Sequence, residues 1–172
     1  MKKGQLTSIL LFLTLCLPGL LFAKTTVSLN GVHLCCKSCV NGVAKAAQSA
    51  GATATSKPQQ RLVVIEAADN ATASKAVAAV AKAGFYGKSS NPSISISTDL
   101  PDATVTSATV SGLHLCCGKC VRAVDKAIES LKGASGHTAE KKSAIFKVTG
   151  SFSLKALSDA LHENGLHGQI TK

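Results

Sequence analysis

Residues 31–40 read GVHLCCKSCV, and residues 112–121 repeat them, 81 positions later, as GLHLCCGKCV. The same offset relates residues 84–87, GFYG, to residues 165–168, GLHG. One module has therefore been duplicated, and both copies keep one histidine and three cysteines. A fold alone does not need such a cluster. The repeat therefore predicts shared thiol chemistry, with metal binding as the leading interpretation.

Each copy alternates between strand and helix patterns around its cysteine segment. Val40, Val43 and Ala47 follow helical spacing, and Gly51 ends this predicted helix. A second helix, capped by Asp69 or Thr72, precedes Gly84; the second copy has equivalent helices over 121–131 and 154–161. The predicted strands are residues 25–32, 52–57, 62–65, a short strand from residue 85, 103–112, 144–148 and 166–170.

This order, β-α-β-β-α-β twice, predicts an α+β fold of two tandem ferredoxin-like sandwiches. We expect domain 1 over residues 24–88, a linker over 89–102 and domain 2 over 103–172. Pro92, Pro101 and several serines give the linker its composition. Residues 94–97, ISIS, alternate like a strand, so we expect them to pair with the edge of the first module.

Residues 1–23 are predicted to be a signal peptide, with Lys2 and Lys3 before an apolar stretch and cleavage after Ala23. Cys16 would leave with it. No later stretch approaches the roughly 20 apolar residues that span a bilayer. We therefore expect a soluble, exported chain that is periplasmic or secreted, with no membrane span after cleavage.

Composition argues against other functions. The net charge is +10, but the lysines are scattered and aromatic residues make up 3% of the chain, so no nucleic-acid binding is expected. The chain has 9 acidic residues and no phosphate-binding loop or recognisable pair of carboxylates, which predicts that it is not an enzyme. The six cysteines after residue 23 lie in two triplets, a distribution typical of sites rather than of long-range disulfides.

Each triplet lies between a predicted strand and the start of a predicted helix. Unpaired N–H groups and the helix dipole favour thiolate there, and Lys37 or Lys119 would add to this effect. Thiolates select soft metals, namely Cu(I), Zn(II) or another thiophilic ion.

Each module resembles a heavy-metal-associated (HMA) domain, the family of copper metallochaperones and of the metal-binding modules of P-type ATPases. Its Met-x-Cys-x-x-Cys loop matches residues 34–39 and 115–120, with Leu34 and Leu115 in place of Met. The resemblance implies two ligand pairs, which are Cys36 with Cys39 and Cys117 with Cys120. It also implies Cu(I) as the ion and a metal donor or acceptor, such as a metal transporter, as the partner.

Both copies depart from the family loop by an additional cysteine, Cys35 or Cys116, and an additional histidine, His33 or His114. Together with the pair these would give a Cys3His set suited to Zn(II). Neighbouring residues on an extended loop point to opposite sides, however. The sequence leaves open whether the extra thiols join an ion, face outward to exchange metal, or crosslink two molecules.

Two other interpretations remain at this point, namely thiol–disulfide redox activity at the Cys-x-x-Cys pairs and inert structural disulfides. His167 is a weaker ligand candidate, because Tyr86 occupies the matching position, and His137 and His162 are expected at the surface. The sequence therefore predicts an exported protein that transfers or sequesters Cu(I), with one ion per module.

Overall fold

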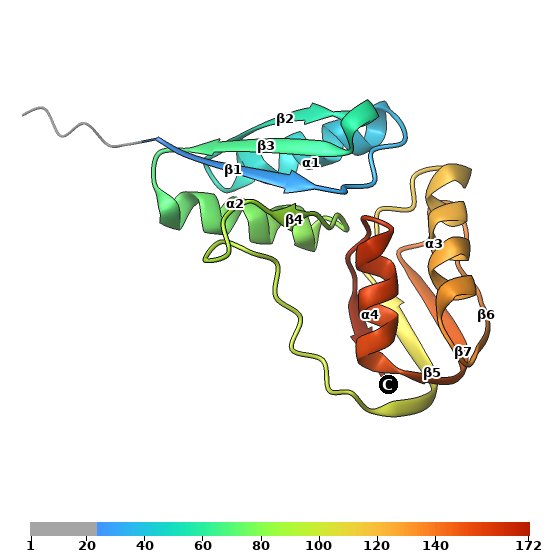
Figure 1. Cartoon of the computed structure of the whole chain (residues 1–172). Helices are drawn as coiled ribbons and strands as arrows, with labels where there is room; N and C mark the ends of the chain where they lie inside the picture. Colours follow the sequence, from blue (N-terminus) through green and yellow to red (C-terminus); the bar gives the residue numbers. More distant parts are fainter. Residues whose placement is uncertain (1–23) are drawn as a thin grey trace, which may run out of the picture.

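The structure, a computed structural model, describes residues 24–172, so the predicted signal peptide lies outside the described residues. Two ferredoxin-like units follow one another along the chain (Figure 1). The first module contains β1 (Thr25–Asn30), α1 (Lys37–Ser49), β2 (Thr53–Lys57), the 3-10 turn η1 (Pro58–Gln60), β3 (Leu62–Ala67), α2 (Asn70–Lys82) and β4 (Lys88–Ser89). The second contains β5 (Thr104–Ser111), α3 (Gly118–Ser130), β6 (Ala134–His137), β7 (Ile145–Ser153), α4 (Leu154–Glu163) and β8 (Gln169–Thr171).

The two sheets are antiparallel and have the same topology. Their strand orders are β2-β3-β1-β4 and β6-β7-β5-β8, so the strand before each cysteine loop is central. Val27 pairs with Ile65 and Leu29 with Val63, and all four side chains are fully buried. This alternation of buried and exposed residues gives each sheet one apolar face, which the two helices of its module cover. The predicted α+β class is confirmed.

Local signals place the helices as the sequence predicts. Asp69 caps α2 by accepting a hydrogen bond from the Thr72 N–H at 2.7 Å. Ser153 caps α4 in the same way through the Ala156 N–H. Leu34 and Leu115, each just before a cysteine triplet, are buried in the core and therefore serve packing.

The last strand of each module is shorter than predicted. The strand expected from residue 85 begins at Lys88, and the strand expected over 166–170 begins at Gln169. The reason is a contact between the modules, because Phe85 and Leu166 form an antiparallel bridge with each other. Their backbones are thus paired across the modules instead of within a sheet.

The linker is a second correction, because residues 90–103 contain no strand. The prediction that 94–97 pair with a sheet edge is wrong. Pro92 and Pro101 lack the N–H that strand pairing uses, and the apolar side chains pack instead. Ile94 is 3% exposed, and Ile96 lies against the core.

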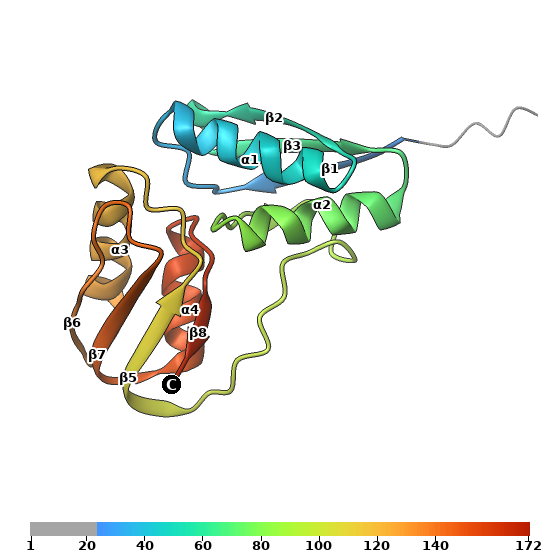
Figure 2. The same ribbon diagram turned by 180° about the vertical axis from the view of Figure 1, so that it is seen from behind.

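The modules meet where their cysteine loops are. Figures 1 and 2 show the linker running along one side to the start of β5, whose other end points back at the first module. The loops after β1 and β5 therefore face each other. Within residues 24–172, none of the helices has both the length and the apolar character needed to cross a membrane.

Candidate metal centre

Each Cys-x-x-Cys pair spans the first turn of a helix, as predicted. Cys36 is the N-cap of α1, and Cys117 is the N-cap of α3, both with extended backbone. Cys39 and Cys120 lie one turn later and are fully buried. This turn brings the sulfur atoms together, since Cys36 Sγ lies 3.7 Å from Cys39 Sγ and Cys117 Sγ lies 3.9 Å from Cys120 Sγ.

The two triplets converge into a single group of thiols between the modules. Cys35 Sγ lies 3.4 Å from both Cys117 Sγ and Cys120 Sγ of the second module. In the reverse direction, Cys116 Sγ lies 3.3 Å from Cys36 Sγ and 3.6 Å from Cys39 Sγ of the first. We call this group the six-thiol cluster; its members are free thiols, namely Cys35, Cys36, Cys39, Cys116, Cys117 and Cys120.

The extra cysteines therefore do not face outward. Cys35 also lies 3.6 Å from Cys39 of its own module, and Cys116 lies 3.6 Å from Cys120. Each extra thiol thus contacts both ligand pairs. The sequence left this open because the sulfur atoms that Cys35 meets on its outer side belong to the other copy of the loop.

Two sets of four sulfur atoms within the cluster are compact enough to hold an ion each. One set is Cys35, Cys36, Cys39 and Cys116; the other is Cys35, Cys116, Cys117 and Cys120. In each set all four atoms lie within 4.8 Å of one another. Four sulfur atoms at about 2.3 Å around one ion would be about 3.8 Å apart. The thiols can therefore close around an ion with small movements.

Backbone N–H groups, burial and neighbouring thiols shift the pKa values of the cluster cysteines in different directions. The Cys39 backbone N–H lowers the pKa of Cys36 to about 7, against the effect of burial, with a further contribution from the Cys116 thiol. Burial, with the Cys117 and Cys120 thiols, raises the pKa of Cys35. Burial, with the Cys36 and Cys120 thiols, raises the pKa of Cys116 to about 12. Lys37 and Lys119 are exposed, so they are solvated.

Cys39 and Cys120 affect each other's pKa in opposite directions. Their contact lowers the pKa of Cys120 and raises the pKa of Cys39. The Cys120 sulfur is thus favoured as thiolate and the Cys39 sulfur as thiol. An ion that binds must displace the remaining protons, and this makes its affinity depend on pH.

The additional histidines flank the cluster but belong to neither set of four. His33 contributes to the lowered pKa of Cys120, while His114 packs on Phe85 with ring centroids 4.9 Å apart. Burial lowers the pKa of His114. The Nε2 atoms of both rings are buried without a hydrogen-bond partner. Within residues 24–172 the compact ligand sets thus consist of four cysteines each, in place of the Cys3His set considered from the sequence.

The GFYG and GLHG segments hold the two loops together, and we call these contacts the module interface. The Gly165 carbonyl accepts from the His33 and Tyr86 N–H groups at 3.2 and 3.1 Å. The Gly84 carbonyl accepts from the His167 N–H at 3.2 Å. Gly84 and Gly165 have positive φ, and a Cβ on either would overlap the backbone of the opposite loop. Glycine is required there by the close approach of two backbones.

His162, expected at the surface, is half-buried in this interface. Its ring stacks on the Tyr86 ring with centroids 3.7 Å apart, and its Nε2 lies 3.1 Å from His167 Nδ1. His137 is also half-buried, paired with Asp125. His167, the weaker ligand candidate, contacts His162 and belongs to neither compact ligand set.

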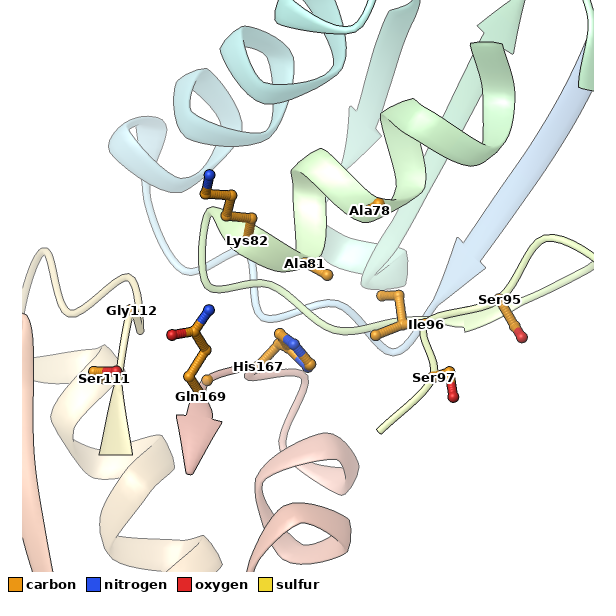
Figure 3. A pocket seen from close by; sticks show the side chains of 11 residues that line it. Ala78, Ala81, Lys82, Ser95, Ile96, Ser97, Ser111, Gly112, His167 and Gln169 are labelled. Carbon is orange, nitrogen blue, oxygen red and sulfur yellow. The ribbon is translucent and has the colours of Figure 1, made fainter. Parts of the chain in front are cut away.

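A cavity of about 430 Å³ lies on one side of the module interface and contains no cysteine. Ala81 and Lys82 at the end of α2, Ile96 of the linker and His167 before β8 surround it (Figure 3). The linker thus covers the place where the modules meet. On another side, beside His33, a basic groove is lined by Arg61, Lys119, Arg122 and Lys126.

Comparisons with known proteins complete this description. No family model matches the chain, and no curated protein does. Among solved structures, the soluble N-terminal domains of Bacillus subtilis CopA are similar at 12% identity, over 88% of this chain and 97% of that one, with a TM-score of 0.34.

Proposed function

We propose that this chain is an exported protein that binds and sequesters Cu(I) through its six-thiol cluster. The convergence of six free thiols on the space between two modules carries the proposal. Soft thiolate sulfur selects soft ions, with Cu(I) prominent among them. The resemblance of both loops to HMA loops favours Cu(I) over the other thiophilic ions.

The burial of the cluster favours holding an ion over passing it on rapidly. Cys39 and Cys120 are fully buried, and the other four cysteines are half-buried. A partner's thiolates would reach the half-buried sulfur atoms first and replace the ligands one by one. This exchange changes no oxidation state and turns over no substrate, so we assign no enzymatic activity.

The basic groove supports a partner with an acidic surface. Its four cationic side chains lie next to His33 and hence next to the cluster. They would attract acidic groups over the range of a Debye length, about 8 Å at physiological salt. A metal donor or acceptor, such as a metal transporter, with acidic residues around its own thiols fits this surface.

Competitive titration tests the proposal. The chain from Lys24 is reduced without oxygen and titrated with Cu(I) against a chelator, with the Cys36→Ser/Cys117→Ser variant as control. We expect about two tightly held ions per chain, and a large loss in the variant because each ligand set loses a sulfur. A variant that keeps the full complement of copper, or a wild-type chain that never competes with the chelator, contradicts the proposal.

Zn(II) is a second candidate, favoured by the spacing of the sulfur atoms. The distances of 3.3 to 3.9 Å within the cluster bracket the roughly 3.8 Å edge of a zinc tetrathiolate. The same titration with Zn(II) decides between the ions, because tight binding of Zn(II) together with weak binding of Cu(I) would make Zn(II) the ion of this site. If neither ion binds, the reduction potential of the two Cys-x-x-Cys pairs tests the redox alternative.

Export is tested separately. Expression of the complete chain in a bacterial host, followed by mass measurement of the periplasmic fraction, should find a chain that begins at Lys24. A cytoplasmic chain that retains residues 1–23 would contradict export without touching the metal chemistry.

A further inference from the structure

We propose that the two modules hold one dinuclear metal centre, in which the Cys35 and Cys116 thiolates bridge two ions. The inference rests on the proposed function and sharpens it. In the expectation from sequence, each module binds its own ion through its own pair. In the structure neither module offers a compact set of four sulfur atoms without the other.

The overlap of the two ligand sets carries the inference. Cys36 with Cys39 belongs only to the first set, and Cys117 with Cys120 only to the second. Cys35 and Cys116 belong to both. If both sets are filled, the two shared sulfur atoms must each contact two ions, which a thiolate can do because it has more than one lone pair.

The distances around the shared atoms are nearly the same on the two sides. Cys35 Sγ to Cys120 Sγ is 3.4 Å, and Cys116 Sγ to Cys39 Sγ is 3.6 Å. Likewise Cys35 Sγ to Cys117 Sγ is 3.4 Å, and Cys116 Sγ to Cys36 Sγ is 3.3 Å. The duplication thus gives each ion two terminal and two bridging sulfur atoms, in equivalent places.

The module interface explains why the bridging is built into the fold. The Phe85–Leu166 bridge and the hydrogen bonds to the Gly84 and Gly165 carbonyls bring the loops together independently of any sulfur atom. The shared thiols are therefore placed by backbone contacts before an ion arrives. Such preorganisation reduces the free-energy cost of assembling the ligands.

The two histidines supply partners for the charge that bridging thiolates concentrate. His33 and His114 each lie two residues before the first cysteine of a triplet, and the Nε2 atom of each ring is buried with no hydrogen-bond partner. A ring N–H directed at thiolate sulfur would satisfy both atoms. This role would also explain why both copies keep a histidine that lies outside the sets of four.

Loading of the centre is ligand substitution without oxidation. Each thiol that becomes a ligand gives its proton to the solvent, and its sulfur lone pair forms the bond to the ion. The bridging thiolates form a second bond of the same kind. No oxidant or reductant is consumed.

X-ray absorption of the wild-type chain loaded with two equivalents of Cu(I) tests the inference directly. One bridging sulfur, bound at about 2.3 Å to each ion, keeps the ions less than about 4.6 Å apart. We expect copper-to-copper scattering within that distance. Two Cu(I) per chain without such scattering would overturn the dinuclear centre and leave copper binding intact.

The Cys35→Ser/Cys116→Ser variant provides the second test. It keeps both Cys-x-x-Cys pairs, so independent sites predict an unchanged stoichiometry and affinity. The dinuclear centre predicts loss of the copper-to-copper scattering and at least about a hundredfold weaker binding, because loss of an outer-shell partner alone costs 10–100-fold. Ser38→Ala, which alters an exposed residue in the first turn of α1, should bind like the wild type.

The outcomes separate the two ideas. Absence of Cu(I) binding by the wild-type chain overturns copper as the proposed ion and this centre with it. Binding of two ions by the wild type, unchanged in the Cys35→Ser/Cys116→Ser variant, overturns only the bridging. The circular dichroism spectrum of each variant shows whether it is folded, and the scattering experiment on the wild type needs no variant.

Discussion

The two sides of the module interface are copies of one another, yet they are filled differently. On one side a cavity of about 430 Å³ lies among Ala78, Ala81, Lys82 and His167. On the other, a cavity of the same volume lies among the residues that the duplication makes equivalent, namely Asp159, His162, Glu163 and Tyr86. The linker and Ala81 line the first cavity, whereas the stacked rings of His162 and Tyr86 line the second.

The difference follows the path of the linker. Ser95, Ile96 and Ser97 line the cavity at Ala81, where a side chain as large as His162 would compete for space. No linker residue lines the opposite cavity, and there His162 stacks on Tyr86. Side chains have diverged where the linker crosses, whereas the glycines and the cysteines are the same on both sides. The shared residues are those that the thiol cluster needs.

The largest effect should come from breaking what the two sides share. Gly84→Ala or Gly165→Ala puts a Cβ into the backbone of the opposite loop, so the modules must separate. We expect loss of the copper-to-copper scattering and a larger radius of gyration in solution X-ray scattering, although every cysteine remains.

Gly51→Ala is the matched control for these variants. Gly51 also follows a helix and has φ of +79°, but its Cβ would meet only the Thr72 methyl at 3.8 Å. The cost of alanine at positive φ, about 1–2 kcal/mol, is therefore common to all three. If Gly51→Ala weakens the metal centre as much as Gly84→Ala, the interface does not position the thiols.

A smaller effect should be a pH dependence of stability that comes from the side with His162. Burial lowers the pKa of His162 to about 4, with a further contribution from the neighbouring His167. A histidine with an ordinary pKa in the separated or unfolded chain takes up a proton near pH 6.5. The stability that His162 contributes is thus present above pH 6.5 and is lost as the pH falls toward 4. Lys88, Asp159 and Glu163 line the same cavity.

His162→Ala makes this side resemble the other, where Ala81 stands. We expect the melting temperature of the reduced, metal-free variant to fall less between pH 7.5 and 5 than that of the wild type. His137→Ala, at a histidine paired with Asp125 within the second module, is the control. Equal slopes for His162→Ala and the wild type would remove His162 from the pH response.

The smallest effect should come from the linker side. Ile96→Ser removes apolar atoms packed against the core at the cavity that the linker lines. At about 0.8 kcal/mol per buried CH₂ group, a half-buried isoleucine should contribute about 1 kcal/mol, or about 2–4 °C in the melting temperature. Ser95→Ala, at an exposed neighbour, should leave the melting temperature unchanged. Equal melting temperatures for both variants and the wild type would mean that the linker packs without stabilising.

Much of this molecule follows from its sequence. Helical spacing and the cap at Asp69 define α1 and α2, and the duplication carries the same plan to the second module. The places of Cys36 and Cys117 at helix starts were also predictable, because a Cys-x-x-Cys pair between a strand and a helix has few other positions.

The convergence of the triplets could not be predicted in the same way. Periodicity reports which face of an element meets its own core, and it is silent on how two complete modules meet. The interface depends on backbone contacts at Gly84 and Gly165, which have no periodic signature. The available signal was the extra cysteine itself, since Cys35 and Cys116 had no place in a site of two ligands per module.

Because of the linker, the two cysteine loops stay together when the protein is diluted. Residues 90–103 connect the modules covalently, so the meeting of the two loops is an intramolecular event. A short flexible linker presents one partner to the other at an effective concentration on the order of millimolar. Two free modules at trace levels would rarely find each other. In one chain the completeness of the cluster is therefore independent of how much protein is present.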